Sequence, residues 1–167
     1  MLERPYNVLF ICRHNTARSQ MAQALLNAVA RRRFVAWSAG TEPAQDIHPL
    51  TLETIRNAGL RTDDLAPKGI ELFMGDDAPV LDFAFTMCEG AEQCPTALTG
   101  QPVRAHWPFP DPLTAQGSHV EQAAEFADIF RMIRRRIELF VELPVERLDR
   151  LTLQRHVDGI GIQPAHL

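Results

Sequence analysis

A short polar loop joins an apolar run to an amphipathic stretch near the start of the chain, and it holds Cys12 and Arg18. Residues 8–11 form a continuous apolar run typical of a buried strand, and apolar side chains recur at helical spacing through residues 21–29. Cys12 ends the expected strand, and Arg18 opens the expected helix. Open α/β sheets bind ligands just beyond the carboxyl ends of their strands, so this loop lies where a ligand site is expected.

The chemistry of this loop suits a tetrahedral oxyanion. Backbone N–H groups and the positive end of the helix dipole would face the anion, and Arg18 can close a two-pronged fork over two oxygens. The same field favours the thiolate form of Cys12, which is the form that attacks. A strand-end cysteine can also be a small buried hydrophobic residue, but the strand–loop–helix setting favours a nucleophile. The candidate oxyanion-binding residues are Arg13, His14, Asn15, Thr16, Ala17, Arg18 and Ser19.

Strands and helices alternate along the rest of the chain. Strands are predicted at residues 7–12, 34–37, 80–87 and 103–107, and helices at residues 18–32, 49–59, 118–143 and 148–157, with a further short helix within 61–77. Ser118 and Glu121 form a capping-box pattern at the start of the longest helix, and Pro144 ends it. The alternation predicts an α/β fold with a mostly parallel sheet. We expect a domain over residues 1–144 and a C-terminal extension, with a short helix and a tail, over residues 145–167.

Two further residues follow predicted strands directly. Cys88 and Asp111 should therefore gather with Cys12 at one edge of the sheet. Asp111 stands in a Pro-Asp-Pro turn and is a candidate general acid for displacement at phosphorus or arsenic. Aspartate before proline is also common in ordinary turns, so the assignment depends on the neighbouring oxyanion loop.

Two additional cysteines open the way to a thiol relay. Cys88 can attack the sulfur of a Cys12 adduct and reduce the bound atom, and Cys94 can then resolve the disulfide. Arsenate accepts two electrons readily, whereas phosphate resists reduction. Alternatively, Cys88 is a packing residue and Cys94 a bystander. We expect no metal site, because zinc takes about four ligands and His106 is the one evident partner for these cysteines.

The composition limits the classes of partner. The 167 residues carry a net charge of −4, which gives no electrostatic reason to bind nucleic acid, and the arginine runs 31–33 and 134–136 are expected on solvated helix faces. No segment approaches the roughly 20 apolar residues that span a bilayer, and the first strand begins too early for a signal peptide. Three cysteines argue against a secreted disulfide scaffold. We expect a cytoplasmic monomer with no nucleic-acid or membrane partner.

Several segments together resemble the arsenate reductases that are built on the low-molecular-weight tyrosine phosphatase fold. The resemblance covers about residues 6–141 and rests on the segments 8–22, 37–40, 85–88, 94–95, 106–107 and 111–112. It implies a three-layer αβα fold with a four-stranded parallel sheet. Asn15 and Ser19 match positions that shape the loop and support the thiolate. The implied catalytic residues are Cys12 as nucleophile, Arg18 as anion clamp, Asp111 as proton donor, Cys88 as second redox thiol and Cys94 as third.

The function implied by the resemblance is the reduction of arsenate to arsenite, with no bound cofactor and with thioredoxin as electron donor. Mycothiol, or glutathione with glutaredoxin, would serve if Cys94 is a bystander. A phosphatase acting on phosphotyrosine or a small phosphomonoester is the alternative, and a non-catalytic oxyanion-binding module is a third. Ala17 and Leu113 replace a cysteine and a tyrosine typical of such phosphatases, which argues against phosphotyrosine. Gln23 replaces a carboxylate that binds potassium in some members, so no potassium site is expected.

Overall fold

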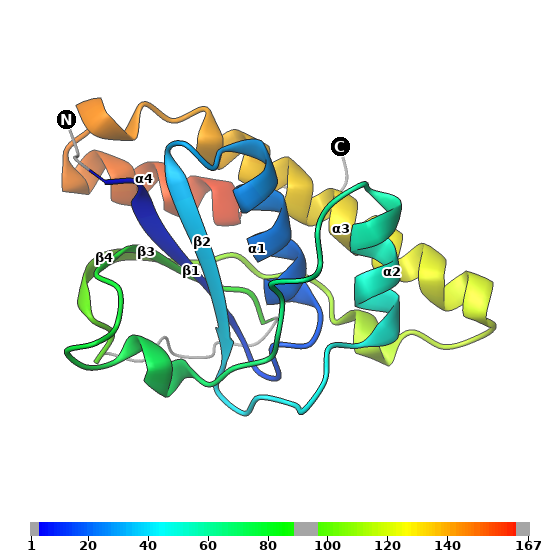
Figure 1. The fold of residues 1–167 in the computed structure, drawn as a ribbon. Coiled ribbons are helices and arrows are strands. Elements are labelled where there is room, and N and C mark those ends of the chain that lie inside the picture. The colour runs from blue at the N-terminus through cyan, green and yellow to red at the C-terminus, as the bar shows by residue number, and fades with distance from the viewer. Residues whose placement is uncertain (1–3, 89–96, 163–167) are drawn as a thin grey trace.

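The computed structural model describes residues 4–88 and 97–162. Its parallel strands form a four-stranded sheet in the order β2–β1–β3–β4 (Figure 1). The strands are β1 (Tyr6–Cys12), β2 (Phe34–Gly40), β3 (Leu81–Thr86) and β4 (Gly100–His106). β1 pairs with both β2 and β3, which places Cys12 at the carboxyl end of an interior strand. The predicted α/β class with a four-stranded parallel sheet is confirmed.

Helices connect and cover the strands. The described residues form α1 (Arg18–Val29), α2 (Pro49–Asn57), α3 (His119–Val141) and α4 (Arg150–Gly161), with 3-10 turns η1 (Ile70–Phe73), η2 (Pro112–Thr114) and η3 (Val145–Arg147). The predicted capping box is present on α3, where Ser118 and Glu121 exchange two side chain–backbone hydrogen bonds of 3.2 Å. Within the described ranges, no helix has both the length and the apolar character needed to cross a membrane.

Two strands are longer than predicted. β2 runs to Gly40 instead of ending near residue 37, and β4 begins at Gly100 instead of Val103. Small residues and glycine have weak strand propensity, so local sequence does not reveal these ends. Pairing with the neighbouring strands decides them: Gly40 lies opposite Cys12 in the β1–β2 register.

Aromatic side chains fill the main core, which lies between the sheet and the four α-helices. Phe85 stacks on Trp107 with ring centroids 3.9 Å apart, and Phe140 from α3 meets Phe85 edge-on at 5.3 Å. Each of these side chains is fully buried, which is worth about 1.5–3 kcal/mol per side chain. A smaller cluster on the opposite face packs against Phe73 of η1. Figure 1 shows α1, α3 and α4 on one side of the sheet and η1 on the other.

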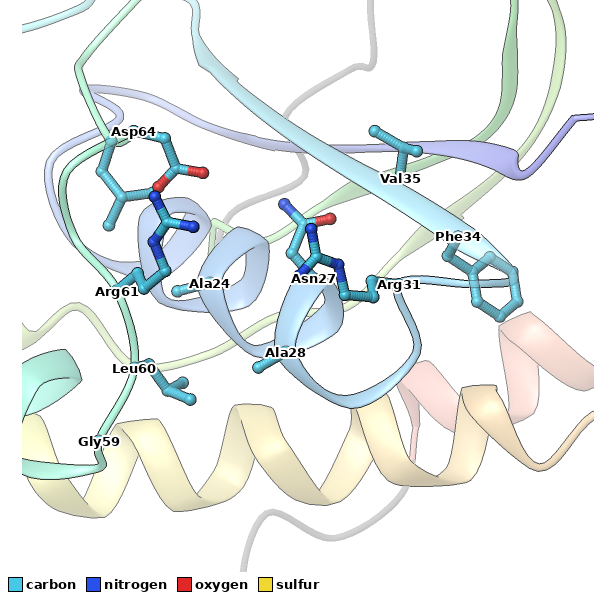
Figure 2. Close-up of a pocket in the computed structure, with 11 residues that line it drawn as sticks. Ala24, Asn27, Ala28, Arg31, Phe34, Val35, Gly59, Leu60, Arg61 and Asp64 are labelled. Atoms are coloured by element: carbon cyan, nitrogen blue, oxygen red, sulfur yellow. The ribbon is translucent and has the colours of Figure 1, made fainter.

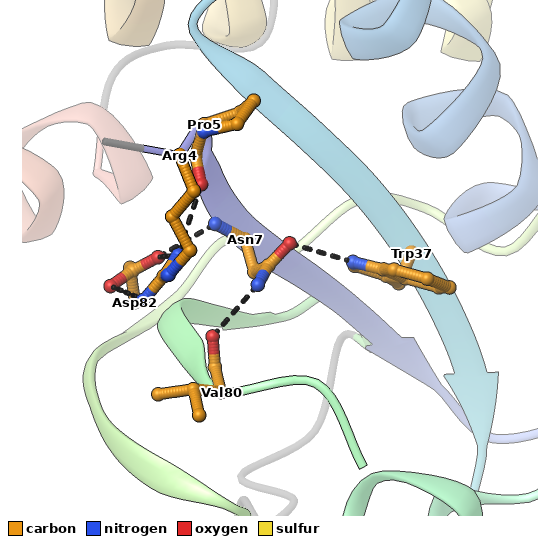
Figure 3. Close-up of polar contacts among 6 residues, drawn as sticks. All are labelled: Arg4, Pro5, Asn7, Trp37, Val80 and Asp82. Atoms are coloured by element: carbon orange, nitrogen blue, oxygen red, sulfur yellow. Dashed lines mark hydrogen bonds and ion pairs between the residues drawn. The ribbon is translucent and has the colours of Figure 1, made fainter. Parts of the chain in front are cut away.

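Polar contacts link the start of β1 to the start of β3 and to the middle of β2 (Figure 3). Arg4 Nη1 and the backbone N–H of Asn7 both donate to Asp82 Oδ2 at 2.7 Å. The Asn7 side chain donates to Val80 O at 2.9 Å and accepts from Trp37 Nε1 at 3.2 Å. Asn7 on β1 thus contacts β2 and the start of β3, which fixes the relative positions of the strands that carry the site.

Helix α4, in the predicted C-terminal extension, covers the outer edge of β4. Arg150 donates to the carbonyls of Gln101 and Pro102 at 2.7 and 3.0 Å, and Trp107 Nε1 donates to Val157 O at 2.9 Å. An exposed strand edge invites pairing with other chains. The extension therefore protects an edge of the sheet and anchors the tryptophan of the core.

Candidate active site

Cys12 lies at the end of β1 and is buried, with 4% of its surface exposed. Its Sγ is 2.8 Å from Ser19 Oγ. Asn15 Nδ2 donates to the same Ser19 oxygen at 2.7 Å, so the hydroxyl hydrogen of Ser19 is free to donate to the sulfur. A hydrogen bond of this kind supports negative charge on sulfur. The three residues are among those predicted for the site, and the structure brings them together.

Asn15 shapes the turn of the loop. Its φ of 53° is in the left-handed region, and no other non-glycine residue of the described chain has a positive φ. Asparagine tolerates this region better than most residues do. Its Oδ1 accepts hydrogen bonds of 3.0 Å from Gln20 Nε2 and from the backbone N–H of Lys68. These two contacts fix the amide orientation and hold the turn from behind.

The carbonyl groups of the loop point outward. Since a trans peptide directs its N–H away from its C=O, the N–H groups of residues 13–17 turn towards the inside of the loop. Successive N–H groups arranged in this way form a concave anion-binding nest at the start of α1. The outward bonds run from Thr41 N to Cys12 O (3.2 Å), Glu42 N to Arg13 O (2.8 Å), Ala44 N to His14 O (3.0 Å), Gln20 Nε2 to Asn15 O (3.0 Å) and His48 N to Thr16 O (3.2 Å).

The side chains of the loop do not fill this nest. Arg13 pairs with Glu42 at 2.9 Å on the outer surface, and His14 Nδ1 lies 3.0 Å from the Glu42 carbonyl. Thr16 Oγ1 donates to Asp46 O at 3.1 Å. The side chains of Arg13, His14 and Thr16 are therefore engaged outside the cradle, and the backbone N–H groups of these residues face its interior.

Arg18 connects the loop to the ends of two other strands. Its Nη1 donates to Met87 O at 3.3 Å and to Phe109 O at 3.0 Å. Its Nη2 lies 3.8 Å from Asp111 Oδ2. Because Nη1 alone serves both carbonyls, Nε and Nη2 remain suited to a two-pronged contact with an anion.

Cys88 and Asp111 lie at the same edge of the sheet. Cys88 is 5% exposed and follows Met87, whose N–H donates to Ile11 O at 2.8 Å and whose carbonyl contacts Arg18. The Asp111 side chain is 31% exposed, and its Oδ1 accepts from Leu113 N at 3.0 Å. The predicted grouping of Cys88 and Asp111 with the Cys12 loop is thus present. Cys94 lies outside the described residues.

Gly40, which ends the segment 37–40 of the family resemblance, allows the close packing of β2 against the loop. A Cβ at this position would lie 2.6 Å from Arg13 O and 3.1 Å from Asn15 N. We expect Gly40→Ala to lower the free energy of unfolding by about 1–3 kcal/mol and to weaken phosphate binding, because the loop must shift. Urea unfolding and calorimetric titration with phosphate measure the two effects.

The matched control is Gly159→Ala in α4, where an added Cβ meets nothing within 4 Å. This variant should leave phosphate affinity unchanged and should be neutral or up to about 1 kcal/mol more stable, because alanine favours a helix. Equal phosphate affinity in Gly40→Ala and the wild type would contradict the packing argument.

His48 joins the loop to α2 and α3, and it was not predicted. Its backbone N–H donates to Thr16 Oγ1 at 2.9 Å, its Nδ1 accepts from Leu50 N at 3.1 Å as the N-cap of α2, and its ring stacks on Phe126 at 4.9 Å. Burial lowers the pKa of His48 from its ordinary value of 6.5. An Nδ1 that accepts a hydrogen bond carries no proton, so the fold favours the neutral ring.

We therefore expect His48 to contribute stability above its unfolded pKa of 6.5 that is lost as the pH falls below that value, since the unfolded state then binds more protons. His48→Asn keeps a capping oxygen but cannot titrate. The free energy of unfolding should therefore fall less in this variant than in the wild type between about pH 7.5 and pH 5.5. Urea titrations measure the free energy of unfolding at each pH. If it falls equally in the wild type and in His48→Asn over this range, His48 contributes nothing to the loss of stability at acid pH.

A cavity of about 450 Å³ opens elsewhere, between α1, the start of β2 and residues 59–65 (Figure 2). Ala24, Ala28 and Leu60 give it apolar walls, and Arg31 and Arg61 add positive charge. None of the predicted catalytic residues that the structure describes lines this cavity. The oxyanion cradle and its thiols are therefore a separate site.

The comparisons with known proteins agree with this geometry. A family model described as low molecular weight phosphotyrosine protein phosphatase matches residues 7–151. An arsenate reductase of Bacillus licheniformis is 31% identical over 137 residues, which are 81% of this chain and 94% of that protein.

Solved structures show the same likeness. The crystal structure of an arsenate reductase from Archaeoglobus fulgidus is 30% identical with a TM-score of 0.59, over 78% of this chain and 98% of that one. A thioredoxin-dependent arsenate reductase of Corynebacterium glutamicum is 30% identical with a TM-score of 0.53, over 84% of this chain and 65% of that one. The family match spans both the oxyanion loop and the acid-bearing turn. The chain therefore belongs to the low molecular weight phosphotyrosine protein phosphatase family.

Proposed function

We propose that this chain reduces arsenate to arsenite through a relay of cysteine thiols. The observation that carries the proposal is the contact of Arg18 with the carbonyl of Met87, because it joins the Cys12 cradle to the segment that bears Cys88. A phosphatase needs a nucleophile, a cradle and an acid, whereas a second buried thiol beside the cradle adds a reductant. Relatives and solved structures named arsenate reductases, at 30–31% identity, support the same activity.

In the first proposed step, the oxyanion binds to the N–H groups of residues 13–17 and to Arg18. The Cys12 thiolate, supported by the Ser19 hydroxyl 2.8 Å away, attacks arsenic and forms an S–As bond. One As–O bond breaks, and Asp111 supplies the proton with which that oxygen leaves as water. Arsenic keeps its oxidation state in this step. The distance of 3.8 Å between Arg18 Nη2 and Asp111 Oδ2 supports these two roles.

In the second proposed step, the Cys88 thiolate attacks the sulfur of Cys12. An S–S bond forms and the S–As bond breaks, and its electron pair passes to arsenic. Arsenic is reduced from the +5 to the +3 state and leaves as arsenite, while the two thiols lose the same two electrons. Both cysteines are buried, and Cys88 follows Met87, whose carbonyl contacts Arg18 of the cradle.

The third proposed step restores the enzyme. The Cys94 thiolate attacks Cys88, which frees Cys12 and leaves a disulfide between Cys88 and Cys94. An external dithiol, which we propose to be thioredoxin, then reduces this disulfide. Mycothiol, or glutathione with glutaredoxin, is the alternative donor. The cytoplasm, where such thiol pools are kept reduced, is the proposed location.

Ester hydrolysis is a second candidate activity, because the same cradle accepts phosphate and Asp111 can protonate the leaving-group oxygen, which then departs as an alcohol. The Cys12 adduct would then be a phosphocysteine that water hydrolyses. This reaction does not need Cys88 or Cys94, so it serves as an internal readout of the cradle and the acid.

The test is arsenate-dependent oxidation of NADPH in the presence of thioredoxin and thioredoxin reductase, run beside hydrolysis of para-nitrophenyl phosphate. We expect arsenate-driven turnover that Cys94→Ser abolishes. Parallel assays with mycothiol and with glutathione and glutaredoxin identify the donor. Ester hydrolysis without arsenate reduction in any of these assays would show that the chain is a phosphatase.

A further inference from the structure

Arg136 is buried within α3, with 5% of its surface exposed. The sequence analysis expected the run 134–136 on a solvated helix face, and this expectation is wrong for Arg136. Helical spacing puts it on the same face as Ile133, Ile137 and Phe140, which are all buried. Burial lowers the pKa of Arg136 from its ordinary value. Placing a guanidinium there costs free energy that a leucine or methionine of similar volume would not.

The guanidinium holds the segment that leads to Asp111. Arg136 Nη1 donates to Pro108 O at 2.7 Å, and Arg136 Cζ lies 4.4 Å from the centre of the Phe109 ring. Phe109 is 1% exposed, and its carbonyl accepts from Arg18 Nη1 at 3.0 Å. Arg136 from the core therefore contacts both Pro108 and Phe109, and Arg18 from the site contacts the carbonyl of Phe109.

Prolines limit the backbone hydrogen bonds that this segment can donate. It lies between the end of β4 and η2, and the prolines at 108, 110 and 112 have no N–H to donate. The N–H of Phe109 donates to Met87 O at 3.2 Å. A planar guanidinium can donate to a carbonyl and stack on an aromatic ring at the same time, which a lysine ammonium cannot do with the same geometry.

We propose that Arg136 is a positioning residue, which sets the position of Asp111 through residues 108 and 109. It does not touch the reacting atoms. The proposal rests on the proposed function in one respect, the acid role of Asp111. Loss of the Arg136 contacts should therefore slow the steps that need a proton from Asp111 more than the steps that do not.

The experiment compares two aryl phosphates with different leaving groups. Phenolate needs a proton to leave, whereas 2,4-dinitrophenolate leaves without one. We expect Arg136→Met to lower kcat for phenyl phosphate by roughly tenfold to a hundredfold, and kcat for dinitrophenyl phosphate by less than about threefold. Arg136→Lys should fall between the wild type and Arg136→Met. Equal losses on both esters, or no loss, would overturn the proposal.

A double-mutant cycle separates positioning from a general structural effect. Once Asp111→Asn has removed the acid, adding Arg136→Met should reduce kcat for phenyl phosphate by less than about twofold. Additive losses would show that Arg136 does not act through Asp111. Arg135→Met, an exposed neighbour on the same helix, is the matched control and should match the wild type on both esters.

Hydrogen exchange tests the positioning role of Arg136 without a measurement of turnover. Amides within residues 107–114 should exchange faster in Arg136→Met than in the wild type, whereas exchange in β1 should not change. If Arg136→Met does not fold, Arg136→Lys takes its place in this comparison. Unchanged exchange there would overturn the positioning role. A wild type that neither reduces arsenate nor hydrolyses either ester would refute the proposed function, and the exchange result would still decide the role of Arg136.

Discussion

Cys12→Ser should reduce both arsenate reduction and aryl phosphate hydrolysis by at least about a thousandfold, because both reactions begin with attack by the same atom. A serine hydroxyl is far less ionised than a thiol at neutral pH. The neighbouring Ser19 hydroxyl, which accepts a hydrogen bond from Asn15, is too weak a base to deprotonate a serine at position 12. Steady-state rates for the two substrates measure the loss.

The control for this variant is anion binding. The cradle consists of backbone N–H groups and Arg18, so Cys12→Ser should bind phosphate within about tenfold of the wild type in calorimetric titrations. Circular dichroism should show the same melting behaviour. Substantial turnover of either substrate by the folded variant would exclude a covalent intermediate on Cys12, and loss of anion binding would show that the thiol is part of the cradle.

Cys88→Ser should separate the two activities. Arsenate reduction should fall by at least about a thousandfold, because no thiol is then present at position 88 to attack the Cys12 sulfur and break the S–As bond. Hydrolysis of para-nitrophenyl phosphate should stay within about threefold of the wild type, since Cys88 has no part in it. Serine is close in size to the buried cysteine, so the packing should be kept.

A single-turnover experiment without any electron donor sharpens this comparison. The reduced wild type, with three cysteines, should release one arsenite per chain and lose two titratable thiols. Cys88→Ser should release none, whereas Cys94→Ser should release one and then stop. Loss of both activities in folded Cys88→Ser would mean that the cysteine shapes the pocket and does not serve as a reductant.

Much of the fold could be predicted because its signals are local. The apolar run before Cys12, the helical spacing after Arg18 and the Ser118–Glu121 capping box each depend on a few neighbouring residues. The ends of β2 and β4 depend on pairing with other strands, which the strand propensities of individual residues do not indicate. The packing of α4 on β4 likewise depends on contacts between distant segments.

The grouping of the predicted site residues followed from the sequence, but most of the contacts that hold them did not. Cys12, Arg18 and Asp111 stand at the ends of recognisable elements, so topology alone brings them together. The Cys12, Arg13, His14 and Thr16 carbonyls accept from backbone N–H groups of residues 41–48, which every sequence possesses and no motif marks. Arg136 could have been found by counting helical positions, because it falls between two buried isoleucines in the apolar stripe.

The outward hydrogen bonds of the loop also determine when the loop can form during synthesis of the chain. The partners of the Cys12, Arg13, His14 and Thr16 carbonyls lie between residues 41 and 48, and the acceptors of Arg18 are Met87 and Phe109, so residues 12–18 are synthesised before all of these partners. At roughly 5–20 residues per second, several seconds pass before the last of these is synthesised. During this interval the loop lacks the groups that shape it, so the geometry around Cys12 can form only after Phe109 has been synthesised.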